Sequence, residues 1–181
     1  MWDELYTWME EHSGCSFDLR EDIERVSGDE AFADTHAWYH NMQYVLDRLS
    51  DACDVVDENW KYLPDTLPNR TEFKKLIVSD TLSGLVKIIK HIDQKLHIEY
   101  EDITSVDELD STIETLYDII EELRTHTVDE IYKTGWFEDY DDENNQVLTE
   151  KFGLHKNDIP NMHDTVQSII ALYEDEDDED E

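Results

Sequence analysis

Basic residues, glycine, proline and cysteine are all scarce in this chain of 181 residues. It contains 14 Lys and Arg, five Gly, three Pro and two Cys. Cys15 and Cys53 lie far apart and form no C-x-x-C pair, which favours reduced thiols of a cytosolic protein over a disulfide framework. With so few interruptions, apolar residues recur at steps of three and four, so the chain is expected to be mainly helical.

Long apolar runs are also missing. No stretch of 18 or more apolar residues occurs, so the sequence predicts no membrane span. Its beginning, MWDELYTWMEE, lacks the basic start and apolar centre of a signal peptide. We therefore expect a cytoplasmic protein, and a host-cytoplasmic one if a phage encodes it. The hydrophobic content of 39%, with five Trp and nine Tyr, is sufficient for a folded core in one domain.

Negative charge is what the chain has in excess. Its 48 Asp and Glu give a formal net charge of −34, and the body remains at −26 without the eight carboxylates of 174–181. Solubility needs a net charge of only about 2–8, and further charge destabilises a compact state. Adaptation to high salt is the alternative explanation. Five Ala, and nine Lys against five Arg, are not typical of such adaptation.

The apolar spacing predicts helices over 2–12, 17–26, 30–62, 71–96, 106–124, 146–152 and 160–173. Gly14, Gly28 and Pro64 supply stop signals. The fold class expected is all-α, an irregular helical bundle with acidic surface helices. An acidic helical domain over 1–173 would precede a disordered acidic tail over 174–181.

Two of these helices are expected to build the core. The 30–62 helix carries an apolar stripe that runs from Trp38 to Trp60 and Leu63. The 71–96 helix is apolar over most of its circumference, which predicts that it is central. Residues 70–98 also carry six basic and three acidic side chains, so the rest of the chain holds a net charge of −37.

Metal-site patterns are incomplete. His36 and His40 lie at i and i+4, which is half of a zinc site, and no E-x-x-H pair completes it. We expect ordinary, partly buried histidines, with a metalloenzyme as the alternative. Residues 139–150 place carboxylates at EF-hand loop positions, but Asn144 replaces the expected glycine. Weak divalent-cation binding there stays open, and we predict no metal site and no cofactor.

The sequence patterns of nucleases and of DNA-binding proteins are incomplete as well. Pro64-Asp65 and Glu72-x-Lys74 have the letters of a nuclease signature but stand too close together. Residues 148–162 resemble a helix-turn-helix, but their flanks are acidic and Pro160 falls inside the second helix. No phosphate loop or nucleophile motif occurs. We predict no catalytic residues, no enzyme and no direct binding of nucleic acid.

Ordered rows of carboxylates are the feature that remains. The 106–124 helix carries seven over 16 residues, about one per 3.4 Å of helix axis, close to the phosphate spacing of one DNA strand. These are Asp107, Glu108, Asp110, Glu114, Asp118, Glu121 and Glu122. The 30–62 helix has a second row, Asp47, Asp51, Asp54 and Glu58. Like charges at i,i+4 are unfavourable, so such rows indicate a functional acidic surface.

Aromatic residues accompany the charge in two segments. WDELYTW spans 2–8, where Leu5 and Trp8 fit core positions. WFEDYDD follows Gly135, and aromatic rings beside carboxylates are typical of interface centres. The candidate partner-binding residues of this second segment are Trp136, Glu138, Asp139, Asp141 and Asp142.

In overall character, the acidic helix rows together with LYEDEDDEDE resemble phage-encoded DNA mimics that overcome restriction, and some acidic anti-CRISPR proteins. The resemblance implies a non-catalytic inhibitor that occupies the site of a basic nucleic-acid-binding protein, such as a restriction enzyme, a CRISPR effector or another nuclease. Two alternatives stay open: an immunity protein that neutralises a cognate basic toxin, and an acidic chaperone of basic proteins.

Deleting the tail, residues 174–181, tests how the charge is used. Long-range attraction by a tail accelerates encounter, whereas the helix rows would hold the partner in place. We expect the deletion to lower the association rate constant more than it raises the dissociation rate constant, as measured by surface plasmon resonance. The reverse result would favour the chaperone.

Overall fold

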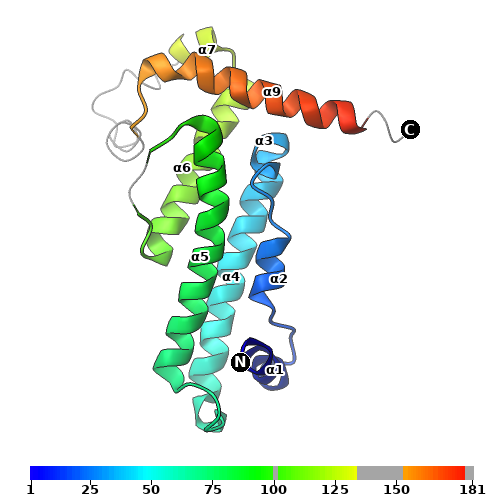
Figure 1. Cartoon of the computed structure of the whole chain (residues 1–181), viewed down its shortest axis with the longest axis vertical. Helices are drawn as coiled ribbons and strands as arrows, with labels where there is room; N and C mark the ends of the chain where they lie inside the picture. Colours follow the sequence, from blue (N-terminus) through cyan, green and yellow to red (C-terminus); the bar gives the residue numbers. More distant parts are fainter. Residues whose placement is uncertain (100–101, 134–152, 178–181) are drawn as a thin grey trace.

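A computed structural model describes residues 1–99, 102–133 and 153–177. Within these ranges the chain forms eight α-helices and no β-strand, so the predicted all-α fold is confirmed (Figure 1). The helices are α1 (Trp2–Ser13), α2 (Leu19–Glu24), α3 (Glu30–Ala33), α4 (Thr35–Asn59), α5 (Arg70–Leu96), α6 (Val106–Thr125), α7 (Val128–Lys133) and α9 (Ile159–Asp177). Short 3₁₀ turns occupy Trp60–Tyr62 and Lys156–Asp158.

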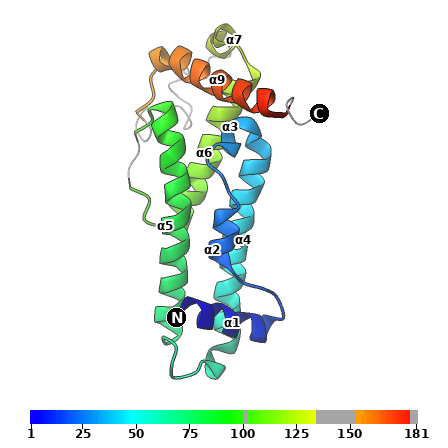
Figure 2. The ribbon, with the colours of Figure 1, turned by 45° about the vertical axis from the view of Figure 1, so that its right-hand side comes forward.

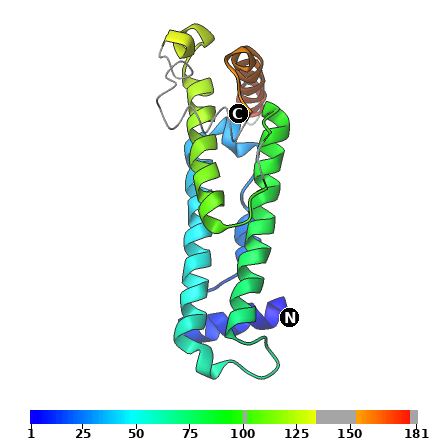
Figure 3. The ribbon, with the colours of Figure 1, turned by 90° about the vertical axis from the view of Figure 1, so that its left-hand side faces the viewer.

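The bundle is elongated. Helices α4 and α5 run antiparallel along its length, and α6 lies beside only one half of them (Figures 1 and 3). Helix α1 crosses one end of this pair, and α9 crosses the other (Figure 2). Each end therefore has its own apolar cluster, one around α1 and the other among α4, α5, α6 and α9.

Polar caps begin the main helices. Side chains of Asp34, Asn69 and Ser105 accept hydrogen bonds from backbone N–H groups in the first turns of α4, α5 and α6. Such caps satisfy donors that have no partner inside the helix. Gly14 ends α1 in the left-handed conformation, as its predicted stop requires. Leu5 and Trp8 are buried, which confirms their predicted core positions.

The prediction for residues 30–62 is partly wrong. Asp34 is extended rather than helical, with φ −139°, so α3 and α4 are separate helices. Trp60 leaves the apolar stripe because the 3₁₀ turn rotates it outward, and 46% of its surface is exposed. Helix α7 was not predicted, because its six residues are too short to show a period.

Helix α4, rather than α5, occupies the centre. It packs against α1, α2, α3, α5 and α6, while one flank of α5 leaves Val78, Leu82 and Val86 only half-buried. Helix α9 extends to Asp177 and so includes the first four residues of the predicted tail; Pro160 stands in its first turn. The predicted helix over 146–152 lies outside the described residues. In the described ranges, no helix is long and apolar enough to cross a bilayer.

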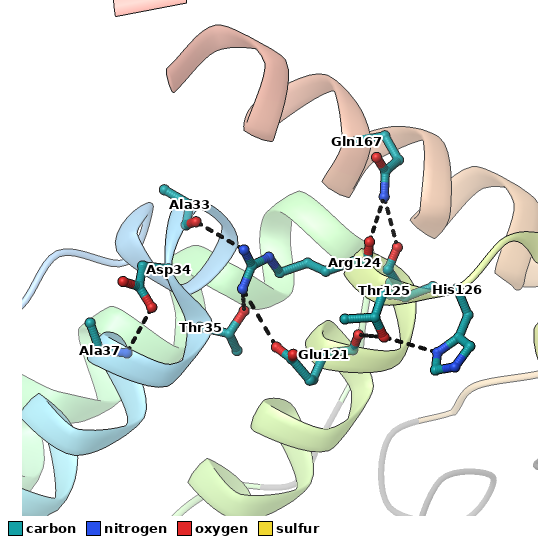
Figure 4. A network of polar contacts seen from close by, with 10 residues as sticks. Ala33, Asp34, Thr35, Ala37, Glu121, Arg124, Thr125, His126 and Gln167 are labelled. Atoms are coloured by element: carbon teal, nitrogen blue, oxygen red, sulfur yellow. Dashed lines mark hydrogen bonds and ion pairs between the residues drawn. The ribbon is translucent and has the colours of Figure 1, made fainter. Parts of the chain in front are cut away.

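Arg124 ties the end of α6 to the junction of α3 and α4. It donates to Thr35 Oγ1 at 3.0 Å and to the Ala33 carbonyl at 3.2 Å, and it lies 3.5 Å from Glu121 (Figure 4). Gln167 on α9 donates to the carbonyls of Leu123 and Arg124. These partly buried hydrogen bonds join four helices, α3, α4, α6 and α9, at one end of the bundle.

Replacing Arg124 by Met should lower the free energy of unfolding by about 1–3 kcal/mol, because the hydrogen-bond acceptors on Ala33 and Thr35 lose their partner. Arg25→Met is the matched control, since Arg25 pairs with Glu21 on an exposed helix face, and this variant should unfold at nearly the same urea concentration as the wild type. Urea unfolding followed by circular dichroism measures both. Equal losses would contradict the assigned role of Arg124.

Candidate acidic interface

The two rows of carboxylates lie on helices that touch along one seam. Gln43 on α4 donates a hydrogen bond of 2.7 Å to Asp110 on α6. One turn away, the rings of Tyr39 and Tyr117 pack with centroids 4.7 Å apart. Since Thr35 at the start of α4 meets Arg124 at the end of α6, the two helices run antiparallel. The seam therefore fixes which carboxylates become neighbours.

Antiparallel contact places the two rows end to end. Asp47 lies one turn beyond Gln43, so the α4 row begins level with the first turn of α6, where the α6 row has its Asp107 end. Both rows stand opposite the core sides of their helices, and the seam lies on adjoining flanks, so they face the same side. At a rise of 1.5 Å per residue, Asp47–Glu58 and Asp107–Asp118 each measure about 17 Å, together roughly one turn of duplex DNA. We call this surface the acidic stripe.

The structure separates the predicted residues into three groups. The stripe consists of exposed carboxylates that make no ion pair or side-chain hydrogen bond with any described residue: Asp47, Asp51, Asp54, Glu58, Asp107, Glu114 and Asp118. Four others have partners within the chain: Glu108 accepts from Thr104, Asp110 from Gln43, Glu121 pairs with Arg124, and Glu122 with His126. Trp136, Glu138, Asp139, Asp141 and Asp142 lie outside the described residues.

No lysine or arginine neutralises the stripe from its own helices. The one basic residue of α4, Arg48, turns toward Asp22 and the Ser16 carbonyl, and the one basic residue of α6 is Arg124. Burial raises the pKa of Tyr39, and the neighbouring Glu114, Asp110 and Asp118 raise it further. Partial loss of solvent raises the pKa of Asp118. Beside the stripe, a polar and an aromatic contact join the two helices, and Arg124 joins them at the end of α6.

Exposed aromatic residues accompany the stripe, and the sequence did not place them there. Tyr44, 53% exposed, stands three residues before Asp47, and Trp60, 46% exposed, stands two residues after Glu58. Large rings beside charges are the usual energetic centres of interfaces. Tyr44 had a sequence signal, since it falls outside the apolar stripe of α4; Trp60 had none, because its spacing continued that stripe.

His36 and His40 precede the stripe on the outer face of α4. Their Nε2 atoms are 3.0 Å apart, and both rings are exposed, so the expectation of partial burial is wrong. They have no third ligand: among the residues with described positions, no group of three His, Cys, Asp or Glu is placed to hold a metal ion. The EF-hand-like segment 139–150 lies outside these ranges.

Comparisons with protein-family models, curated proteins and solved structures return no match for this chain. The function therefore has to be argued from the chain's own surface.

Gln43→Glu tests the seam. It replaces the amide donor by a carboxylate 2.7 Å from Asp110, so the free energy of unfolding should fall by about 1–3 kcal/mol. Half a molar NaCl should restore part of this loss, because salt screens like charges. Ser50→Glu adds the same charge at an exposed position of α4 and is the control, with an expected change below about 0.5 kcal/mol. Urea titrations at low and high salt measure the free energy of unfolding of both variants. Equal losses, with equal recovery in salt, would contradict the contact between Gln43 and Asp110.

Proposed function

We propose that the chain is a non-catalytic inhibitor that occupies the basic nucleic-acid-binding site of another protein. The observation that supports this most is the acidic stripe, in which two helices present one row of carboxylates about as long as a turn of duplex DNA. A channel that binds DNA offers lysine and arginine side chains at phosphate spacing. A rigid row of carboxylates meets the same cations and releases the same counterions.

The acidic stripe is electrostatically unfavourable for folding, which supports a functional reason for its presence. Carboxylates four residues apart on one helix repel each other by a few tenths of a kcal/mol per pair. Among the described residues the row on α4 forms no ion pair, while Asp57, on another flank of the same helix, pairs with both Arg70 and Lys74. Arg70 and Lys74 thus neutralise a carboxylate where α4 and α5 meet, and the carboxylates on the outer face of α4 keep their negative charge.

The proposal predicts a partner of definite shape. It should carry a basic groove about 35 Å long, matching two rows of about 17 Å each, with an apolar recess for Trp60 or Tyr44 near the groove's middle or end. Restriction enzymes, CRISPR effectors and other nucleases have such grooves. On this proposal, the protein needs no metal and performs no reaction, since occupation alone blocks the site.

Neutralising the stripe tests the proposal. The variant Asp47→Asn, Asp51→Asn, Asp54→Asn, Glu58→Gln should reduce affinity for the partner retained from host lysate at least about tenfold, because it removes charges at the contact. The control removes four exposed carboxylates from α1 and α2: Asp3→Asn, Glu10→Gln, Glu11→Gln, Glu24→Gln. Its affinity should change less than about threefold.

Titration calorimetry with the retained partner compares the two variants at equal net charge. If both lose affinity equally, total charge and not the stripe governs binding, as expected for a chaperone of basic proteins. If the immobilised protein retains no nucleic-acid-binding protein, the proposal fails.

A further inference from the structure

The open flank of α5 carries a groove with an apolar floor. Val78, Leu82 and Val86 line it from the helix, and Ile103 lines it from the connection to α6. The groove has a volume of about 620 Å³. Helix α6 begins only halfway along α5, which leaves this flank uncovered (Figure 3). Half-buried Val78, Leu82 and Val86 add to the buried apolar face of α5, which is why the helix appeared apolar over most of its circumference in the sequence.

The groove continues toward the end of α5. A second hollow of about 680 Å³ shares Lys90 with the first and reaches Asp93, His97 and Asp102. Because α5 lines both hollows on the same flank, they form one elongated groove. Each of the two hollows by itself lies in the size range of sites for small organic ligands, which is roughly 300–1,000 Å³.

Two of the three lysines of this groove have no ion-pair partner among the described residues. Lys75 lies 3.6 Å from Glu72, whereas Lys87 and Lys90 form no ion pair there, although the chain has 48 carboxylates for 14 basic residues. Two arginines, by contrast, form ion pairs: Arg20 pairs with Asp80, and Arg70 pairs with Asp57. In a protein with a net charge of −34, two adjacent unpaired cations beside an apolar floor indicate a site for a negatively charged ligand.

Asp93 has a buried carboxyl group at the far end of the groove. Only 4% of the residue is exposed, and in the described part of the chain neither carboxyl oxygen has a hydrogen-bond partner. The His97 and Ile98 N–H groups bond to the backbone carbonyl of Asp93 instead. Burial raises the pKa of Asp93 to about 8, although Lys90 lowers it. At neutral pH this carboxyl is therefore mostly protonated and has an O–H group to donate.

We infer that this groove binds a small organic anion with an apolar body. The apolar body lies on Val78, Leu82, Val86 and Ile103, and the anionic group meets the ammonium groups of Lys87 and Lys90. The neutral carboxyl of Asp93 donates a hydrogen bond to the same anionic end. The site is on α5, separate from the acidic stripe of α4 and α6, so neither proposal depends on the other.

Two matched dyes test the site in the full-length protein. 8-Anilinonaphthalene-1-sulfonate carries an aromatic body and a sulfonate, and N-phenyl-1-naphthylamine is its uncharged counterpart. The sulfonate dye should bind with one-to-one stoichiometry, and decanoate should displace it. The variant Lys87→Met, Lys90→Met should weaken the sulfonate dye at least about tenfold and the neutral dye less than about twofold.

Lys95→Met is the control. Lys95 is also exposed on α5 and unpaired, but it does not line the groove, so affinity for the sulfonate dye should be unchanged. Equal losses in Lys95→Met and in the groove variant would show a general charge effect and overturn the inference. Absence of saturable dye binding, or displacement by duplex DNA but not by decanoate, would overturn it too.

The pH dependence tests the role of Asp93. Because the pKa of Asp93 is raised to about 8, it loses its proton as pH rises through 8, and its charge then repels the bound anion. Affinity for the sulfonate dye should fall between pH 7 and 9 in the wild type and stay level in Asp93→Asn.

Lys90, His97, Glu99 and Asp102 are the other ionisable groups of this end of the groove. The fall in affinity should persist in His97→Gln and in Asp102→Asn. If Asp93→Asn retained the wild-type pH profile, Asp93 would have no part in the site.

Discussion

The seam between α4 and α6 is the contact on which the other features depend. Each helix has one basic residue, and both helices carry carboxylates toward the same side, so ion pairs cannot join them there. Tyr39 against Tyr117 and the hydrogen bond from Gln43 to Asp110 do so instead. Neutral contacts of this kind keep the helices together without reducing the charge of the outer face. Arg124 closes the same seam at its end.

A strongly acidic chain also has to limit self-repulsion, and the structure shows where it does so. The basic residues gather on flanks where helices meet: Arg48 against Asp22, Arg20 against Asp80, and Arg70 and Lys74 on Asp57. Central α4 then supplies the apolar surface that both ends of the bundle share. Lys87 and Lys90 take no part in these contacts and line the groove on α5 for which we propose an organic anion.

Much of the fold was predictable from the sequence, because long amphipathic helices have clear periods and caps. The bounds expected for α5 and α6 differ from the observed ones by a single residue. The helix break at Asp34 and the outward turn of Trp60 were not predictable, since both depend on backbone angles that the apolar spacing does not encode. In the candidate site, the sequence predicted the carboxylate rows on α4 and α6. Their end-to-end order was not predictable, because it requires the antiparallel contact of two helices distant in the chain.

The central claim is that the acidic stripe and nucleic acid occupy the same place on the partner. Fluorescence anisotropy of a labelled short duplex bound to the partner measures this directly as the protein is added. We expect complete release of the duplex, with an inhibition constant that rises steeply with salt, because both ligands use the same cations. A stable ternary complex, with the duplex still bound at saturating protein, would contradict the account.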